Sequence, residues 1–336
     1  MKVLVLSAQN IDPLINMKEA LVLAERAYDF QGKIKKGILP AHFSPLVSYE
    51  VKGPLGAPGF FDFRSGYVSE IPIIVSTMGY GFPENKLHRG LPGVFAISLI
   101  SDIDTGVPLA LMDADFLSSM RTGAASAICS KYLARKNSRT IAFIGAGHLA
   151  RNMLDAHMEF GFPLDRVRVW SRTGANREEF AKWAAEKYRI LAVPTESPTD
   201  AVRGADIVCC CSPSLEPRVM YDDLSTGVHI NAFGADSPGK QEVEPKVLTN
   251  SKIVVDDLEQ CSIGGEIHKA LRSGVITTKN IYAEIGEIVQ GEKPGRISGA
   301  EITLMDATGL AIQDLAIFYE AYKLALEEGI GNWVQL

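Results

Sequence analysis

The chain lacks the features that mark several large classes of protein. Its 336 residues include five cysteines, and none of these forms a C-x-x-C pair or the Cys and His spacing of a zinc site. No stretch approaches the roughly 18 apolar residues of a membrane span, and the apolar run after Met1 is too short for a signal peptide. We therefore expect a protein of the reducing cytoplasm with no metal centre and no membrane partner.

Charge of one sign is not concentrated anywhere in the chain. The formal net charge is −6, and the charged residues are spread without blocks of one sign, which argues against a nucleic-acid partner. There is no internal repeat and no low-complexity stretch. Because one hydrophobic core seldom grows beyond roughly 250 to 300 residues, this length predicts two domains.

The segment from 139 to about 260 alternates strands with helices. Apolar strands are expected at 140–144, 166–170, 206–211, 228–232 and 252–256, with helices at 148–160 and 177–188 among those between them. This alternation is typical of an α/β fold with a doubly wound parallel sheet, the Rossmann type. The run Ile207–Cys211 fits a strand covered on both faces, so the cysteine triplet within it is interpreted as buried core.

The rest of the chain has a different pattern. Before residue 118 a helix is expected from Met17 to Gln31, followed by short strands broken by Pro and Gly. A last helix is expected from Leu310 to Glu328. We predict an α+β substrate-binding and dimerisation domain built from 1–118 with 310–336, and a dinucleotide-binding domain at 119–309.

One motif carries the clearest chemistry. After the strand ending at Ile144 the chain reads Gly145-Ala146-Gly147-His148-Leu149-Ala150, a G-x-G-x-x-A pattern between a strand and a helix. The first glycine allows a tight turn, the second lets the backbone approach a pyrophosphate, and the helix N-terminus faces the phosphates. The residues from Gly145 to Leu149 are therefore predicted to bind a dinucleotide.

The next strand indicates which dinucleotide. It ends Trp170-Ser171-Arg172-Thr173, where an acidic residue normally binds the ribose hydroxyls of NAD and an arginine accommodates the 2′-phosphate of NADP. Arg172 can pair with a phosphate, and Ser171 and Thr173 offer hydroxyl groups. NADP(H) is favoured over NAD(H); the alternative is that Arg172 is a solvated residue at a strand end.

Two charged residues are candidates for the chemistry. Asp236 follows the strand 228–232 at the edge where open α/β sheets bind ligands, and a carboxylate there can hold or relay a proton for an amine or imine. Its alternative role is the N-cap of a helix after Pro238. Arg121 could bind a substrate carboxylate, and its alternative role is an interdomain salt bridge. The polar segment 295–303 is a third candidate region.

These segments resemble the ornithine cyclodeaminase and mu-crystallin family over essentially the whole chain. The resemblance rests on Thr105-Gly106-x-Pro108-Leu109-Ala110, Arg121-Thr122-x-Ala124-Ala125, Gly145-x-Gly147, Gly234-x-Asp236-x-Pro238-Gly239-Lys240, Val255-Asp256-Asp257, Gly265-Glu266-Ile267, Glu301-Ile302-Thr303 and Gly309-Leu310-Ala311-Ile312-x-Asp314. Members include cyclodeaminases, amino-acid and opine-type dehydrogenases and NADPH-dependent ketimine reductases. The resemblance implies a homodimer formed through the first domain.

The same resemblance implies roles for individual residues. Asp236 matches the family's catalytic aspartate and Arg121 its carboxylate-binding arginine, while the Arg172-Thr173 pair is similar to NADPH-binding members. Further cofactor contacts are expected at Thr122, Ser212 and Asn231.

Two positions depart from the family pattern. The family usually has Pro-x-Arg where this chain has Pro40-Ala41-His42, and a lysine on the strand 73–76, which we place at Ile74. His42 and Ile74 are thus the expected substrate-site positions that lack the usual cations. Residues that can compensate are His42, Arg64, Lys86 and Arg89.

The sequence therefore predicts an NADP(H)-dependent oxidoreductase that transfers hydride between nicotinamide and the α-carbon of an imine or amino acid. Two alternatives stay open. One is an ornithine-type cyclodeaminase that keeps NAD bound and releases ammonia, although the missing cations argue against ornithine. The other is a protein that binds NADPH and a small ligand, as mu-crystallin does. The side chain of the substrate is not predicted.

Overall fold

The computed structural model describes residues 1–52, 58–82, 85 and 88–336. Lys86 lies outside the described residues. The chain divides into two compact units: unit 1 comprises Met1–Arg121 and Leu310–Leu336, and unit 2 comprises Thr122–Gly309. The first boundary falls at Arg121, inside a helix, where the sequence pattern placed it at 118.

Unit 1 is built around a mixed eight-stranded sheet. The strand order is β16-β1-β7-β6-β5-β4-β2, and β3 also pairs with β4. Its elements are β1 (Lys2–Leu6), α1 (Ala8–Ile11), α2 (Met17–Lys35), β2 (Ala41–Phe43), β3 (Val47–Lys52), β4 (Pro58–Val68), β5 (Ile73–Gly81), β6 (Val94–Asp102), β7 (Pro108–Asp113), α12 (Ala311–Glu328) and β16 (Asn332–Gln335). Helix α4 (Asp115–Leu133) runs across the boundary between the units.

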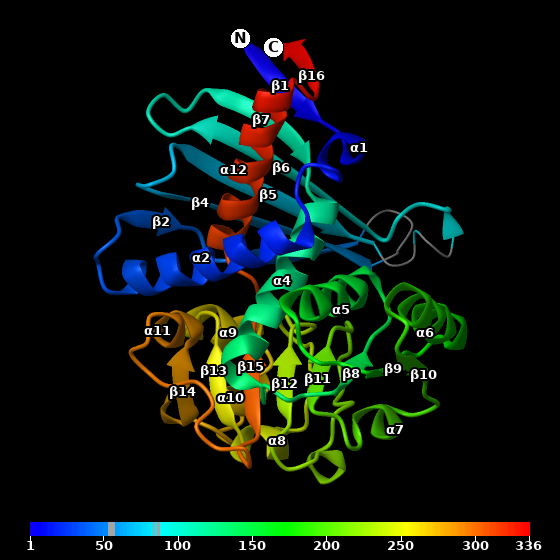
Figure 1. Ribbon diagram of the computed structural model, residues 1–336. Helices are drawn as coiled ribbons and strands as arrows, with labels where there is room; N and C mark the ends of the chain where they lie inside the picture. The colour runs from blue at the N-terminus through cyan, green and yellow to red at the C-terminus, as the bar shows by residue number, and fades with distance from the viewer. Residues whose placement is uncertain (53–57, 83–84, 86–87) are drawn as a thin grey trace. The chain divides into compact units, whose positions relative to one another are not determined.

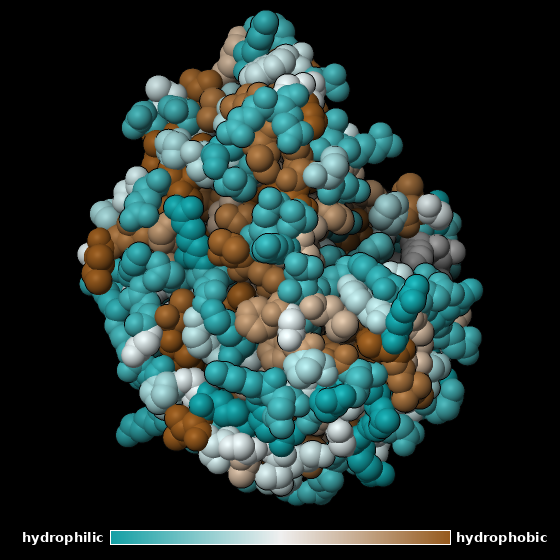
Figure 2. Space-filling view, viewed as in Figure 1, coloured by the Kyte–Doolittle hydropathy of each residue, from teal (hydrophilic) through white to brown (hydrophobic). Residues whose placement is uncertain are grey.

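One face of this sheet is covered by helices. Helix α12 lies across β4 and β5 and packs against α2, so the last helix of the chain and the first long one lie side by side (Figure 1). Buried side chains such as Tyr28 and Phe318 form the core beneath them. Seen from this side, the surface mixes hydrophilic with hydrophobic residues (Figure 2).

The other face of the sheet of unit 1, which we call the outer face, carries exposed apolar side chains. Residues paired across the strands share a face, and Phe61, Tyr80 and Phe95 are paired in this way. Phe61, Phe95, Ile97 and Leu111 are 36–40% exposed. On β5 the alternate residues Ile73, Val75 and Thr77 are buried instead, which places them on the helix-covered face.

Unit 2 is an eight-stranded sheet with the order β10-β9-β8-β11-β12-β15-β13-β14. Every paired strand is parallel. Its strands are β8 (Thr140–Ile144), β9 (Arg166–Trp170), β10 (Leu191–Pro194), β11 (Ile207–Cys210), β12 (His229–Ala232), β13 (Lys252–Val255), β14 (Ile281–Glu284) and β15 (Thr303–Asp306). Its helices after α4 are α5 (His148–Phe160), α6 (Gly174–Tyr188), α7 (Pro198–Val202), α8 (Pro245–Thr249), α9 (Leu258–Gly264), α10 (His268–Arg272) and α11 (Ile285–Val289).

The strand order of unit 2 reverses between β8 and β11. The chain runs outward from β8 through β9 to β10 and then returns to β11 on the other side of β8. Ligands of open α/β sheets bind outside the carboxyl ends of the strands at such a switch point. The strand interiors are fully buried: Phe143, Val208 and Cys209 are all 0% exposed. The Rossmann-type doubly wound sheet that the sequence predicts is confirmed, and the cysteine triplet begins in its core.

Two features are absent from the described residues. No helix in the described part of the chain is long and apolar enough to cross a membrane. Within the same described residues, no cluster of three or more His, Cys, Asp or Glu side chains is arranged to hold a metal ion.

Candidate active site

The turn after β8 has a geometry that only glycine accepts. Gly145 has φ +125°, and a Cβ built on it would lie 2.6 Å from the backbone oxygen of Cys211. Both the dihedral angle and the close approach exclude other side chains. Gly147 precedes α5 with no side-chain cap, and no atom lies within 4 Å of a Cβ built there. The open space and the amide groups of His148 and Leu149 at the helix N-terminus fit a dinucleotide pyrophosphate.

A pocket of about 370 Å³ opens beside this turn in unit 2. Its lining includes Gly145, Ala146, Gly147, Ser171, Arg172, Thr173 and Ser212, which the sequence predicted, together with Trp170, Asn176, Cys211, Pro213, Ser214 and Arg218. None of these described lining residues is acidic. Arg172 is exposed and forms no ion pair with any described residue. The described lining therefore contains two cations, Arg172 and Arg218, and no carboxylate.

Arg218 is a pocket residue that the sequence reasoning missed. Its Nε donates to the Ser214 hydroxyl at 3.2 Å, and its guanidinium carbon lies 5.8 Å from the ring centroid of Trp170. Arg218 follows β11 by a long irregular loop, so its approach to the end of β9 depends on the sheet order. No spacing in the sequence signals that approach.

Four predicted cofactor contacts are not part of this pocket lining: Thr122, His148, Leu149 and Asn231. Asn231 is fully buried in the middle of the sheet: its amide donates to Ser130 Oγ at 2.8 Å, and its Oδ1 pairs with His229 Nε2 at 3.0 Å. Both polar groups of the Asn231 side chain are therefore hydrogen-bonded within the buried sheet. The prediction that Asn231 binds cofactor is wrong for this reason. Thr122 lies on α4 and does not line the pocket either.

The predicted catalytic carboxylate lies at the carboxyl edge of the same sheet. Asp236 follows β12, its side chain is 44% exposed, and the Lys240 ammonium lies 2.5 Å from its Oδ1. The next helix, α8, begins at Pro245 with Glu244 as its N-cap, and around Pro238 the backbone forms a turn in which Lys240 N–H donates to the Ser237 carbonyl at 3.3 Å. The alternative role of Asp236 as a helix cap is therefore wrong, and the carboxylate is available to a ligand.

A buried histidine holds the turn that carries Asp236. The ring of His268 accepts a hydrogen bond from the Gly239 N–H at Nε2, 3.1 Å away, and its Nδ1 lies 2.6 Å from the Gly265 carbonyl. The carbonyl can only accept, so Nδ1 carries the proton and Nε2 is free to accept. Burial lowers the pKa of His268, which keeps the ring neutral as this arrangement requires.

Two buried glutamates lie behind the same turn. Glu242 Oε1 accepts hydrogen bonds from Ser212, and Glu266 accepts the backbone N–H groups of Glu242 and Val243 at 2.7 to 3.0 Å. Burial raises the pKa of each carboxyl to about 8. A Cβ on Gly234 would lie 1.9 Å from Glu242 Oε2, so this packing also requires glycine before Asp236.

In unit 1 the predicted carboxylate-binding arginine is buried against the start of α12. Arg121 Nε donates to Asp314 Oδ1 at 2.9 Å, and its Nη1 donates to Gln313 Oε1 at 3.0 Å. Its side chain is 7% exposed, and burial lowers its pKa while the charge of Asp314 opposes that shift. The ion pair lies within unit 1, so the alternative of an interdomain salt bridge is not what holds Arg121.

The two departures from the family pattern both lie on the outer face of the sheet of unit 1. His42 is exposed on β2 and pairs in register with Tyr67, on the outer face. Ile74 alternates with the buried Ile73 and Val75 and so also faces outward. Their role as substrate-site positions stays a prediction. Arg89 donates to Asn85 Oδ1 at 2.8 Å, whereas Arg64 lies near Asp314.

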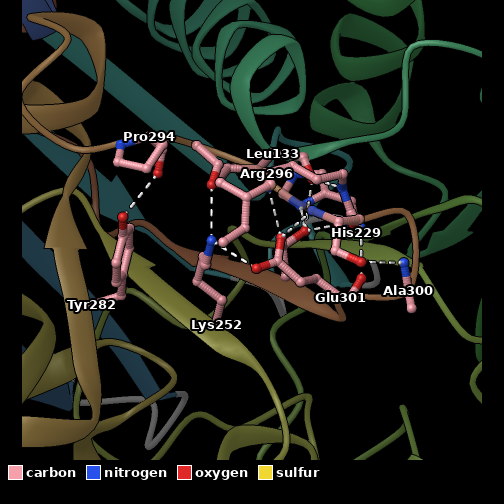
Figure 3. Close-up of polar contacts among 12 residues, drawn as sticks. Leu133, His229, Lys252, Tyr282, Pro294, Arg296, Ala300 and Glu301 are labelled. Carbon is pink, nitrogen blue, oxygen red and sulfur yellow. Dashed lines mark hydrogen bonds and ion pairs between the residues drawn. The ribbon is translucent and has the colours of Figure 1, made fainter.

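The polar segment 295–303 is anchored at the opposite edge of the sheet of unit 2. Arg296 donates to the carbonyls of Leu133 and Glu301, and Lys252 pairs with Glu301 at 2.8 Å (Figure 3). The segment leads into the amino end of β15, beside the amino end of β12. Ligands bind at the carboxyl ends of such strands, so this cluster holds the sheet and takes no part in the site.

Comparison with known proteins decides the family. The model of the ornithine cyclodeaminase/mu-crystallin family matches residues 75–329. The chain belongs to this family. Among its relatives, the alanine dehydrogenase of Archaeoglobus fulgidus is 36% identical, covering 100% of this chain and 99% of the relative. A Delta(1)-pyrroline-2-carboxylate reductase of Bacillus cereus is 31% identical over 99% of both chains.

Solved structures of family members agree with the fold throughout. An archaeal alanine dehydrogenase dimer with bound NAD has a TM-score of 0.91 at 36% identity and covers 100% of both chains. The Delta(1)-pyrroline-2-carboxylate reductase of Thermococcus litoralis, in complex with NADH and L-proline, has a TM-score of 0.90 at 34% identity over 98% of this chain and 99% of that one. The expected class, a nicotinamide-dependent oxidoreductase of imines or amino acids, is confirmed within this family.

Proposed function

We propose that the protein is an NADP(H)-dependent reductase of 2-imino acids that forms the corresponding amino acids. One observation carries the proposal: the pocket beside the Gly145 turn and the exposed Asp236 carboxylate lie at the same edge of one sheet. In the relatives named above, the activities are alanine dehydrogenation and reduction of a cyclic imine.

The preference for NADP(H) rests on charge in the pocket. The two solved relatives contain NAD and NADH, yet here Arg172, Ser171 and Thr173 line the pocket without an acidic residue among the described lining. A guanidinium binds a 2′-phosphate through paired, charge-assisted hydrogen bonds, and NAD recognition normally needs a carboxylate at this place. Arg218 adds a second cation to the same lining.

Asp236 and Arg121 would have different roles in the reaction. The cofactor, when bound, supplies or accepts the hydride. Asp236 would stabilise the iminium or deliver its proton through water, since its carboxylate is half exposed and lies 2.5 Å from the Lys240 ammonium. Arg121 would orient the substrate carboxylate from unit 1, where Asp314 and Gln313 fix its guanidinium.

The test is a substrate screen on the purified protein. Cyclic imines such as Δ1-pyrroline-2-carboxylate, and 2-oxo acids mixed with ammonia or amines, are supplied with NADPH, and its oxidation is followed at ~340 nm. We expect steady oxidation with at least one 2-imino acid and a lower KM for NADPH than for NADH. Ammonia release from ornithine or lysine with no net change in NADPH would instead show a cyclodeaminase.

We also propose that the protein is a cytoplasmic homodimer. The outer face of the sheet of unit 1 presents Phe61, Phe95, Ile97 and Leu111 to solvent, and contiguous apolar surface of this kind commonly marks a protein interface. One solved relative is a dimer. All five cysteines are free, which suits a reducing compartment.

A further inference from the structure

We propose that Arg64 binds the carboxylate of the substrate together with Arg121, as the cation that replaces the lysine absent from β5. This inference rests on the proposed function, because it names the part of the substrate that unit 1 holds. The cation that binds the substrate carboxylate would then come from β4, whereas the family resemblance placed it on β5.

The guanidinium of Arg64 lies near the Asp314 carboxylate but forms no hydrogen bond with it. Its Nε lies 3.7 Å from Asp314 Oδ2, and its side chain is 13% exposed. Among the described residues, neither Nε nor Nη1 of Arg64 has a hydrogen-bond partner, and Asp314 Oδ2 has none either. Buried donors left unpaired cost free energy, so a ligand that brings carboxylate oxygens to this guanidinium recovers hydrogen bonds that the protein does not supply.

Arg64 and Arg121 flank one acidic side chain. Arg121 donates to Oδ1 of Asp314 at 2.9 Å, while Arg64 faces Oδ2. Asp314 is fully buried in the first turn of α12, and the N-terminus of a helix also favours a nearby anion. One carboxylate therefore serves two guanidinium groups, and the hydrogen bonds of Asp314 go to Arg121 rather than to Arg64.

The sheet register explains why Arg64 is the residue in this position. Arg64 on β4 pairs directly with Thr77 on β5, and Thr77 is buried on the helix-covered face with its hydroxyl 3.3 Å from that of Ser98. Thr77 is short and uncharged, so Arg64 is the charged residue of this cross-strand pair. Asp62, on the same face of β4, lies over Gly79, with Oδ1 2.5 Å from where a glycine Cβ would be, and has its own contacts.

The experiment measures carboxylate binding without turnover. Pyrrole-2-carboxylate is a planar ring acid with no reducible imine, and pyrrole-2-carboxamide is its uncharged match. Both are titrated calorimetrically into the full-length protein saturated with NADP+, for the native chain and for Arg64→Leu, Arg64→Lys and Arg89→Leu. Arg89 is the matched control, because it is a unit 1 arginine bonded to Asn85 and not to Asp314.

The native protein should bind the carboxylate more tightly than the carboxamide. Arg64→Leu should weaken carboxylate binding by about 10- to 100-fold while leaving carboxamide binding within about twofold, since charged hydrogen bonds are lost only for the acid. The affinity of Arg64→Lys for the carboxylate should lie between those of the native protein and Arg64→Leu. The affinity of Arg89→Leu should match that of the native protein. Retained NADP+ binding and an unchanged melting temperature show that each variant is folded.

Three results would overturn the role of Arg64: undiminished carboxylate binding by Arg64→Leu, equal loss of both probes, or no preference for the acid in the native protein. Because calorimetry requires no reduction, these results stay separate from the substrate screen. A native protein that binds the acid through Arg64 but oxidises no NADPH would refute the proposed function alone.

Discussion

Glu242 Oε1 accepts two hydrogen bonds from Ser212, one from its backbone N–H at 2.9 Å and one from its hydroxyl at 2.5 Å. Ser212 lines the nucleotide pocket, and Glu242 follows the turn that carries Asp236. One buried carboxyl group thus connects the two parts of the site in unit 2. Its other oxygen, Oε2, has no hydrogen-bond partner among the described residues, which suits a protonated carboxyl group.

Ionisation of Glu242 should weaken the binding of NADPH at alkaline pH. Burial raises its pKa to about 8, so the group is mainly neutral at pH 7 and gains a negative charge beside the pocket as the pH rises through 8. We expect the Kd for NADPH to rise by roughly three- to tenfold from pH 7 to pH 9.5, as repulsion from one nearby charge would give. Glu242→Gln keeps an oxygen for Ser212 and cannot ionise, so its Kd should rise less than that of the native protein, with Glu266 as the remaining buried carboxyl group that ionises in this range. Glu244→Gln, two residues later, is the control; a flat native profile would refute the assignment.

The role of Asp236 predicts a loss of turnover without a loss of cofactor. Asp236→Asn retains the shape of the side chain but removes the charge that lies 2.5 Å from the Lys240 ammonium. We expect kcat for imine reduction to fall by about 10²- to 10⁴-fold, the usual contribution of a proton-transferring group. Stopped-flow fluorescence should give a Kd for NADPH within twofold of the native value. Lys240→Gln should affect kcat less; an unchanged kcat in Asp236→Asn would exclude a catalytic role.

The strands and helices around the nucleotide motif were predictable because local pattern and tertiary structure agree there. The strand 140–144 and the helix 148–160 occur with the predicted bounds, since an apolar buried run, a glycine turn and an amphipathic helix each specify one structure. The sequence pattern did not reveal β15, which lies in the sheet between β12 and β13. Its four residues Thr303–Asp306 hold two apolar side chains between two polar ones, a shorter apolar run than those of β8 and β11.

The substrate-side residues were less predictable, because they depend on which face of a strand each residue occupies. Shifting a strand register by one residue exchanges its two faces, and the placement of the missing lysine at Ile74 put it on the outer face. Arg64 was one of four compensating candidates, but only the ion pair with Asp314, 250 residues away in the chain (314 − 64), distinguishes it. His268 had no sequence signal, since its role depends on the backbone of Gly239.

Arg172 should determine the choice between the two nicotinamide cofactors. It is exposed at the end of β9 and lines the pocket without an ionic partner among the described residues. Arg172→Glu places a carboxylate where ribose hydroxyls bind, so we expect KM for NADPH to rise by roughly 100-fold, a loss of ~2 to 3 kcal/mol, and KM for NADH to change little or fall. Steady-state kinetics with both cofactors measure this, with Arg166→Glu at the other end of β9 as control. Equal changes for both cofactors would show that Arg172 does not contact the phosphate.

The outer face of unit 1 predicts how the subunits associate. Ile97 and Phe95 are 36% and 40% exposed, on adjacent rows of that face. Ile97→Glu would bury a charge in an apolar interface, so the protein should run as a monomer in light scattering after gel filtration, whereas the native protein runs as a dimer. Val22→Glu on the exposed side of α2 is the control, since Val22 is 66% exposed. A dimeric Ile97→Glu protein would place the interface elsewhere.

A buried histidine in unit 2 should contribute a measurable pH dependence to stability. His157 is fully buried, its Nδ1 donates to the Met153 carbonyl at 2.7 Å, and its Nε2 accepts from the Ser130 hydroxyl at 2.8 Å. Burial lowers its pKa from 6.5 to about 4, so between these values the unfolded chain binds a proton that the folded chain refuses. Stability is therefore full above pH 6.5 and is lost as the pH falls toward 4.

His157→Gln isolates this effect from the opposing effect of the buried glutamates, whose raised pKa values favour folding at lower pH. The variant keeps a polar group beside Ser130, and its side chain at position 157 has no ionisation that could be coupled to folding. Urea unfolding at pH 7 and pH 5 should show the native protein losing about 2 kcal/mol more than the variant over this range. His42→Gln, on an exposed edge strand, should change nothing. Parallel losses in the native protein and His157→Gln would mean that His157 is protonated in the folded state, and that the hydrogen bond from Ser130 is not what orients its ring.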